Sequence, residues 1–179
     1  MLVVLEGIDG AGTTTQLSLI ANELRQQGFN VITTAEPSEG LIGQILRCIL
    51  RKSIDVNNDI LALLFAADRV DHGEKLIKPF LNKDNDIVLC DRYTASSIAY
   101  QGINCGEDWI ADINSKAIPA DLVLFFDVTL EESIKRRSKR NIGRELFEKD
   151  DIQQKAKENY TDRKEMSPDY IIFGIKWSA

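Results

Sequence analysis

The sequence lacks any apolar stretch near the roughly 20 residues that a membrane-spanning helix requires. It shows no apolar leader either, because Met1 runs directly into a short apolar segment with the character of a first strand. We therefore expect no membrane association and a cytoplasmic location.

Cysteine and positive charge are also scarce. The three cysteines, Cys48, Cys90 and Cys105, are odd in number and widely spaced, which argues against a disulfide framework or a zinc site and suits reduced thiols. Lys and Arg number 22 against 28 Asp and Glu, for a formal net charge of −6 at pH 7, so general affinity for nucleic acid is not expected. The length of 179 residues and the 44% hydrophobic content fit one globular domain spanning residues 1–179.

A lysine is missing from the most informative segment, residues 2–15, LVVLEGIDGAGTTT. Gly7 and Gly12 have the spacing of a phosphate-binding loop and Thr14 fills its hydroxyl position, but Thr13 stands where the lysine is usual. A Gly-rich turn between a strand and a helix directs backbone N–H groups at an anion, and the threonine hydroxyl could hold Mg²⁺. The segment favours a nucleotide-phosphate site, with an ordinary Gly-rich turn as the alternative.

Apolar segments typical of strands alternate along the chain with segments of helical periodicity. The expected strands are residues 2–5, 29–33, 87–90, 122–126 and 170–173. This alternation predicts an α/β fold of the P-loop NTPase type, with a parallel sheet of about five strands flanked by helices on both faces. Ligands of such sheets bind at the carboxyl ends of the strands.

Candidate ligand-binding residues follow the third expected strand. Asp91 can hold Mg²⁺ or its waters, and Arg92 offers a planar guanidinium to a phosphate. An Asp–Arg surface pair at a helix start is the alternative. Combined with the Gly-rich turn, the two residues indicate a site for two phosphate groups.

Two further features are ambiguous by themselves. Phe65 and Arg69 are four residues apart and share a helix face, which suits a nucleobase, although a core Phe beside a solvated Arg is the more common case. A basic cluster spans residues 136–144 in an otherwise acidic chain. Such a cluster is usually a solvated helix face, but a mobile basic segment could also close over a polyphosphate.

Taken together and in order, these segments resemble the thymidylate kinase family over nearly the whole chain. The matching segments are EGIDGAG (6–12), EP (36–37), Arg47, LFAADR (64–69), His72, DRY (91–93), SS (96–97), AYQG (99–102), PADL (119–122) and ELFE (145–148). Each segment is weak alone, but their joint order and spacing are highly specific.

The resemblance implies transfer of the γ-phosphoryl group of ATP to dTMP, with Mg²⁺, and a role for each matching residue. ATP phosphates would lie on the loop residues Gly7, Asp9, Gly10, Ala11, Gly12, Thr13, Thr14 and Thr15, and Mg²⁺ on Thr14 and Asp91. The dTMP site would comprise Asp9, Glu36, Arg47, Phe65, Arg69, Arg92, Ser96, Tyr100 and Gln101. The catalytic residues would be Asp9, Arg92, Arg137 and Arg140, the last two from a lid at about residues 136–148, as in the bacterial type of this family. The family also implies a symmetric homodimer, and we assign no chemistry to His72.

Two departures from the family pattern leave alternatives open. Thr13 removes the usual cation beside the β- and γ-phosphates, and a lid arginine could compensate. The chain ends at Ala179, where the family continues into an adenine-contacting loop and a final helix, so looser recognition of adenine is plausible. The alternatives are a kinase for dUMP or an analogous pyrimidine nucleotide, and a catalytically weakened nucleotide-binding homologue.

Overall fold

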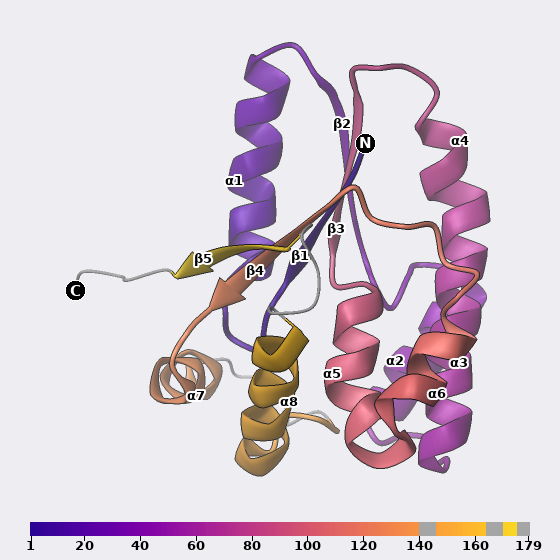
Figure 1. The fold of residues 1–179 in the computed structure, drawn as a ribbon, viewed down its shortest axis with the longest axis vertical. Helices are drawn as coiled ribbons and strands as arrows, with labels where there is room; N and C mark the ends of the chain where they lie inside the picture. Colours follow the sequence, from indigo (N-terminus) through magenta and orange to yellow (C-terminus); the bar gives the residue numbers. More distant parts are fainter. Residues whose placement is uncertain (140–145, 164–169, 175–179) are drawn as a thin grey trace.

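In the computed structural model, a central parallel sheet is flanked by helices on both faces (Figure 1). The structure describes residues 1–139, 146–163 and 170–174. Its strands are β1 (Leu2–Glu6), β2 (Asn30–Ala35), β3 (Asp86–Asp91), β4 (Leu122–Asp127) and β5 (Tyr170–Gly174). They lie in the order β2-β3-β1-β4-β5, and every neighbouring pair is parallel. The predicted α/β fold class is confirmed.

The helices follow the strands as the alternating pattern predicts. They are α1 (Thr13–Gln26), α2 (Leu41–Leu50), α3 (Asn58–His72), α4 (Lys78–Phe80), α5 (Thr94–Cys105), α6 (Glu107–Ile113), α7 (Leu130–Ser138) and α8 (Asp150–Arg163), with a π-helical turn at Gly73–Ile77 between α3 and α4. Among the described residues, no helix is both long enough and apolar enough to cross a membrane.

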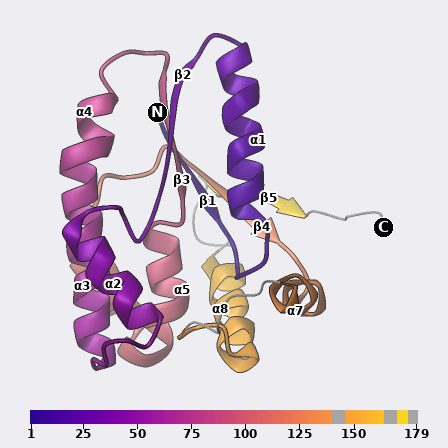
Figure 2. The same ribbon diagram turned by 180° about the vertical axis from the view of Figure 1, so that it is seen from behind.

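The core is divided by the sheet because successive side chains of a strand point to opposite faces. On β1, Val3 and Leu5 pack into a cluster with α1, α5 and α8, whereas Leu2 and Val4 pack into a second cluster with the π-helical turn and α4. Figure 2 shows α1 and the α3–α4 stretch on opposite sides of the sheet. Both faces of β1 are therefore buried, which explains its uninterrupted apolar sequence.

The carboxyl ends of the strands meet at the edge where α5, α7 and α8 lie (Figure 1). The loop between β1 and α1 and the segment following β3 both belong to this edge, since β1 pairs directly with β3 and Leu5 lies opposite Asp91. The register therefore brings two segments more than 80 residues apart in sequence to one place, as parallel pairing of these strands requires.

Candidate active site

The Gly-rich loop joins β1 to α1 in a conformation that depends on its glycines. Gly10 and Gly12 have φ angles of 83° and 94°, in the left-handed region that L residues rarely adopt. A Cβ atom on Gly10 would also lie 2.9 Å from the carbonyl oxygen of Ser133 in α7. The loop thus reaches α1, whose first-turn N–H groups begin at Thr13, in a geometry suited to an anion. Thr13 itself is buried, and Thr15 is exposed.

A hydroxyl and a carboxylate meet beside this loop. The Thr14 hydroxyl donates to Asp91 Oδ2 at 2.5 Å, whereas Asp91 Oδ1 is buried without a hydrogen-bond partner within the described residues. Hard oxygen donors with one unused carboxylate oxygen fit Mg²⁺, which is usually held by few protein groups and completed by phosphates and water. The described residues contain no cluster of three or more His, Cys, Asp and Glu side chains able to hold a metal without substrate.

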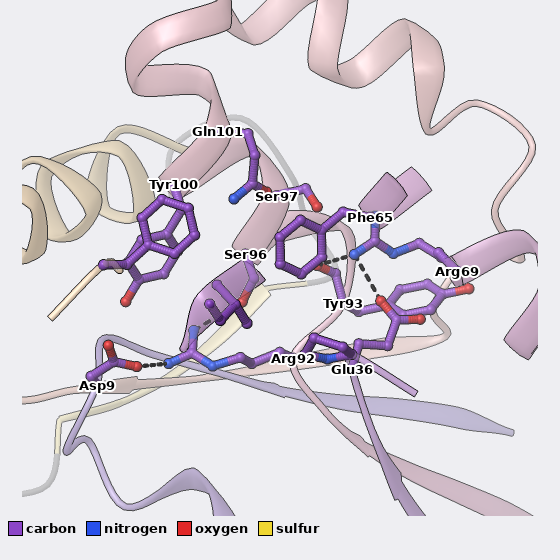
Figure 3. Close-up of a pocket in the computed structure, with 13 residues that line it drawn as sticks. Asp9, Glu36, Phe65, Arg69, Arg92, Tyr93, Ser96, Ser97, Tyr100 and Gln101 are labelled. Carbon is purple, nitrogen blue, oxygen red and sulfur yellow. Dashed lines mark hydrogen bonds and ion pairs between the residues drawn. The ribbon is translucent and has the colours of Figure 1, made fainter. Parts of the chain in front are cut away.

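Arg92 follows β3 and points across the sheet edge toward the Gly-rich loop (Figure 3). One terminal nitrogen lies 2.5 Å from Asp9 Oδ1, the other donates to Ser96 Oγ at 3.2 Å, and the guanidinium lies 5.3 Å from the centre of the Tyr100 ring. Burial lowers the pKa of Arg92, but Tyr100 and Asp9 outweigh it and hold that pKa above its usual value. Its backbone φ of 69° is unusual for a residue other than glycine, which is a common feature of functional sites.

A pocket opens beside Arg92 (Figure 3). Its walls are Asp9, Glu36, Pro37, Leu50, Phe65, Arg69, Arg92, Tyr93, Ser96, Ser97, Tyr100, Gln101 and Phe147. Aromatic rings and a few polar groups of this kind suit a flat, polar heterocycle. Of the residues predicted for the acceptor nucleotide, only Arg47 is not in the pocket wall.

Ser97 and Phe147 are pocket residues that lie in family-matching segments but were given no role from the sequence. Ser97 Oγ is buried and has no hydrogen-bond partner within the described residues, although it lines the pocket with Gln101. The spacing of four residues between them on one helix face was the available signal. Phe147 packs on Tyr100 with ring centres 5.5 Å apart and comes from the segment before α8.

Arg69 lines the pocket but is held by protein groups. It is 1% exposed, forms an ion pair with Glu36 Oε2 at 2.7 Å, and donates to Tyr93 O at 3.0 Å and to Asn114 Oδ1. His72 Nδ1 lies 3.1 Å from the other oxygen of Glu36. His72 therefore contacts and orients a pocket carboxylate.

Arg47 does not line the pocket but contacts the turn that carries the wall residue Pro37. Its guanidinium donates to Pro37 O at 2.8 Å, to Ser38 O at 2.5 Å and to Glu39 Oε1 at 2.6 Å. The turn that it grips is also held by Asp68, which accepts from Ser38 Oγ at 2.6 Å. In this structure Arg47 supports the turn that carries Glu36 and Pro37, so its contact with a phosphate stays a prediction.

The basic cluster begins on α7 and contacts the Gly-rich loop. Arg136 donates to the carbonyl oxygens of Gly10 and Ala11 at 3.2 and 3.3 Å, and its Nε lies 2.7 Å from Glu132. Arg137 donates to Glu148 O at 2.5 Å and lies 2.7 Å from Asp150 Oδ1. Arg140, with the rest of residues 140–145, lies outside the described residues.

Helix α8 contributes two buried polar residues that sequence reasoning missed. Tyr160 and Ser96 both hydrogen-bond the Glu6 carboxylate, at 2.9 and 2.6 Å, and burial raises the pKa of Glu6. Gln153, which is fully buried, contacts Asp9. Gln153 and Tyr160 lie in a helix whose polar composition is typical of a solvent-exposed helix, and no sequence signal pointed to them.

Comparison with known proteins finds the same resemblance across the chain. A family model described as thymidylate kinase matches residues 5–173. A protein of Thermococcus onnurineus named probable thymidylate kinase is 39% identical over 183 residues, covering 96% of this chain and 88% of the relative. A protein of the same name from Methanocaldococcus jannaschii is 44% identical over 161 residues, covering 89% of this chain and 79% of the relative. A solved thymidylate kinase structure from Candida albicans superposes with a TM-score of 0.81 at 27% identity, covering 96% of this chain and 82% of that one.

Proposed function

Because the chain belongs to the thymidylate kinase family, we propose that it transfers the γ-phosphoryl group of ATP to dTMP and releases dTDP and ADP. The observation that carries this proposal is the position of the Asp9–Arg92 pair, with Asp9 in the Gly-rich loop and Arg92 in the wall of the adjoining pocket. A donor phosphate on the loop and an acceptor phosphate on Arg92 would then face each other.

On the donor side, the backbone N–H groups of residues 10–15 bind the ATP phosphates. Thr14 and Asp91 would hold Mg²⁺. The fit rests on the Asp91 carboxylate, which accepts from the Thr14 hydroxyl at Oδ2 and whose Oδ1 has no hydrogen-bond partner among the described residues. When bound, the metal ion neutralises charge on the β- and γ-phosphate oxygens.

On the acceptor side, Arg92 grips the phosphate of dTMP and Phe65 stacks on the base. Gln101, Ser96 and Arg69 offer polar groups to the base, and Tyr100 packs against the sugar near Asp9. In the reaction an acceptor phosphate oxygen bonds to the γ-phosphorus as the bond to the β–γ bridging oxygen breaks. No general base is required, because a phosphate monoester is already a nucleophile at neutral pH. The chain's contribution is alignment and charge stabilisation.

The missing P-loop lysine requires another cation, and we assign that role to the lid at about residues 136–148. Arg137 and Arg140 are the catalytic candidates, and Arg136 already contacts the Gly-rich loop. Thr13→Lys tests this assignment. A change of only a few fold agrees with compensation by the lid, whereas a gain of several orders of magnitude contradicts it.

We further propose that the enzyme acts in the cytoplasm as a homodimer. The support for the dimer is a set of exposed apolar side chains on α2 and α3, where Leu41 is 79% exposed and Ile45, Ile60 and Leu63 are each close to half exposed. Sedimentation analysis at micromolar concentration tests the dimer, and a monomer would contradict it.

Formation of ADP from Mg-ATP and dTMP tests the proposed activity, with dUMP as a parallel acceptor. Turnover that depends on dTMP supports the proposal, and equal turnover of dUMP would favour the broader pyrimidine kinase, because one methyl group discriminates weakly.

The presence of Thr13 favours one further candidate, a weakened nucleotide-binding homologue. Binding of dTMP without turnover would select it.

A further inference from the structure

Gln153 is fully buried in the first turn of α8, yet its amide is polar at both ends. Its oxygen accepts from the backbone N–H of Asp9 at 2.9 Å and from the Tyr100 hydroxyl at 3.2 Å. Its nitrogen donates to Asp9 Oδ2 at 2.6 Å and to the Phe147 carbonyl oxygen at 2.9 Å. Two accepted and two donated bonds use the whole hydrogen-bonding capacity of a glutamine side chain.

These partners fix which way the amide points. The Asp9 N–H needs an acceptor and the Asp9 carboxylate needs a donor, so exchanging the oxygen and nitrogen of Gln153 would break both contacts. Gln153 therefore holds Asp9 at its main chain and at its side chain simultaneously, and Asp9 cannot rotate its carboxylate without losing its hydrogen bond to the buried Gln153 amide.

The Gln153 amide is uncharged, so it binds the Asp9 carboxylate without neutralising its charge. Gln153 occupies Oδ2, which leaves Oδ1 to Arg92 at 2.5 Å. A lysine or arginine at position 153 would compete with Arg92 for the carboxylate charge, whereas an amide orients that carboxylate and leaves its charge for Arg92.

Gln153 also connects Asp9 to the last residues of the proposed lid. Phe147, whose carbonyl it binds, lines the pocket, and Asp150 at the start of α8 is paired with Arg137 of α7. The seating of α8 and the orientation of Asp9 are thus linked by direct contacts.

We propose that Gln153 is the positioning residue for Asp9, holding its carboxylate toward Arg92 at the junction of the two phosphate sites. This inference rests on the proposed function, because the position of Asp9 matters only if phosphate groups meet there. Gln153 acts through Asp9 and need not touch either substrate.

A double-mutant cycle between Gln153 and Asp9 tests the proposal. Gln153→Met keeps the length of the side chain and removes all four hydrogen bonds of the amide, including both to Asp9. It should lower kcat/KM for dTMP roughly 10- to 100-fold, the effect of losing a hydrogen bond to a charged group. In an Asp9→Ala background the same substitution should change kcat/KM less than about threefold, because its target is already gone. KM for ATP should stay near the wild-type value. The matched control is Gln154→Met, since Gln154 is exposed and its side chain donates to Glu158 on its own helix.

Each outcome decides between positioning and packing. Equal losses in the wild-type and Asp9→Ala backgrounds, or equal losses for Gln153→Met and Gln154→Met, would overturn the proposal. If Gln153→Met does not fold, Gln153→Asn keeps a polar amide but shortens its reach by one methylene, and the same dependence on Asp9 is expected. Calorimetric titration with dTMP should show weaker binding to Gln153→Met, and unchanged affinity together with unchanged turnover would overturn the proposal. If the wild-type protein phosphorylates dTMP and Gln153→Met does so equally well, the role of Gln153 is refuted and the proposed function stands. If the wild-type protein neither binds nor phosphorylates dTMP, the proposed function is refuted as well.

Discussion

Replacing Arg92 by alanine removes the cation that we place on the acceptor phosphate. The backbone at position 92 has a φ of 69°, which is equally unfavourable for arginine and alanine, so Arg92→Ala changes the side chain without changing the backbone cost. The lost contacts are those to Asp9 at 2.5 Å, to Ser96 at 3.2 Å and to the Tyr100 ring at 5.3 Å, together with any contact to a bound phosphate.

The expected loss of activity in Arg92→Ala depends on how far the Arg92 side chain is buried. Two unit charges about 4 Å apart interact by roughly 4 kcal/mol at an effective dielectric constant of about 20, which corresponds to about a thousandfold. Because the Arg92 side chain is 23% exposed, water screens part of this interaction. We therefore expect kcat/KM for dTMP to fall about 100- to 1,000-fold.

A coupled assay of ADP formation across dTMP concentrations measures the loss, and calorimetry measures dTMP binding separately. Arg92→Lys keeps the charge but not the planar fork, so its activity should lie between wild type and Arg92→Ala. The control is Arg25→Ala, because Arg25 donates to Val31 O, away from the pocket, and its loss should leave turnover unchanged. Activity of Arg92→Ala within about fivefold of wild type, in a protein of unchanged Tm, would refute the role of Arg92 as phosphate clamp.

Three further predictions test the base site, the metal site and the fold. Phe65→Ala should raise KM for dTMP about tenfold or more with a smaller change in kcat, since burial of a large apolar side chain contributes about 1.5–3 kcal/mol, and an unchanged KM would remove the stacking assignment. Asp91→Asn should raise the Mg²⁺ concentration needed for half-maximal turnover, and an unaltered Mg²⁺ titration would contradict metal binding at Asp91. Hydrogen bonds from the Asn30 side chain and from two backbone N–H groups lower the pKa of Asp86 despite its burial. Its folded pKa is below the unfolded value, so its stabilisation is present at neutral pH and is lost as pH falls through the folded pKa. The Tm of Asp86→Asn should accordingly lie below that of wild type at pH 7 and approach it in acid, and a gap in Tm that does not depend on pH would refute this account.

The sequence predicted the fold class and the elements that are local in sequence. Buried parallel strands such as β1 and β3 are recognisable because both faces are covered, which requires uninterrupted apolar residues. The approach of Asp91 to Thr14 was also predictable, since parallel strands place their carboxyl ends, and the loops that follow them, at one edge.

Other parts of the site depend on contacts that no local pattern encodes. Arg47 and Arg69 matched family positions, but their contacts were not predicted. Arg47 is held by the turn that carries Pro37, and Arg69 is held by Glu36, Tyr93 and Asn114, which come from segments distant in sequence. Helix α8 is rich in polar residues, and that composition gave no reason to bury Gln153 or Tyr160.

By itself, the sequence determined which segments become strands and helices, where the Gly-rich loop lies and which charged residues follow the strands, because hydrophobic period and backbone preference act over a few residues. Only the tertiary structure decided which of those charges meet. It set Arg92 against Asp9 and the Gln153 amide against the same carboxylate, because a buried polar group must find a partner wherever the packing of the whole chain places one.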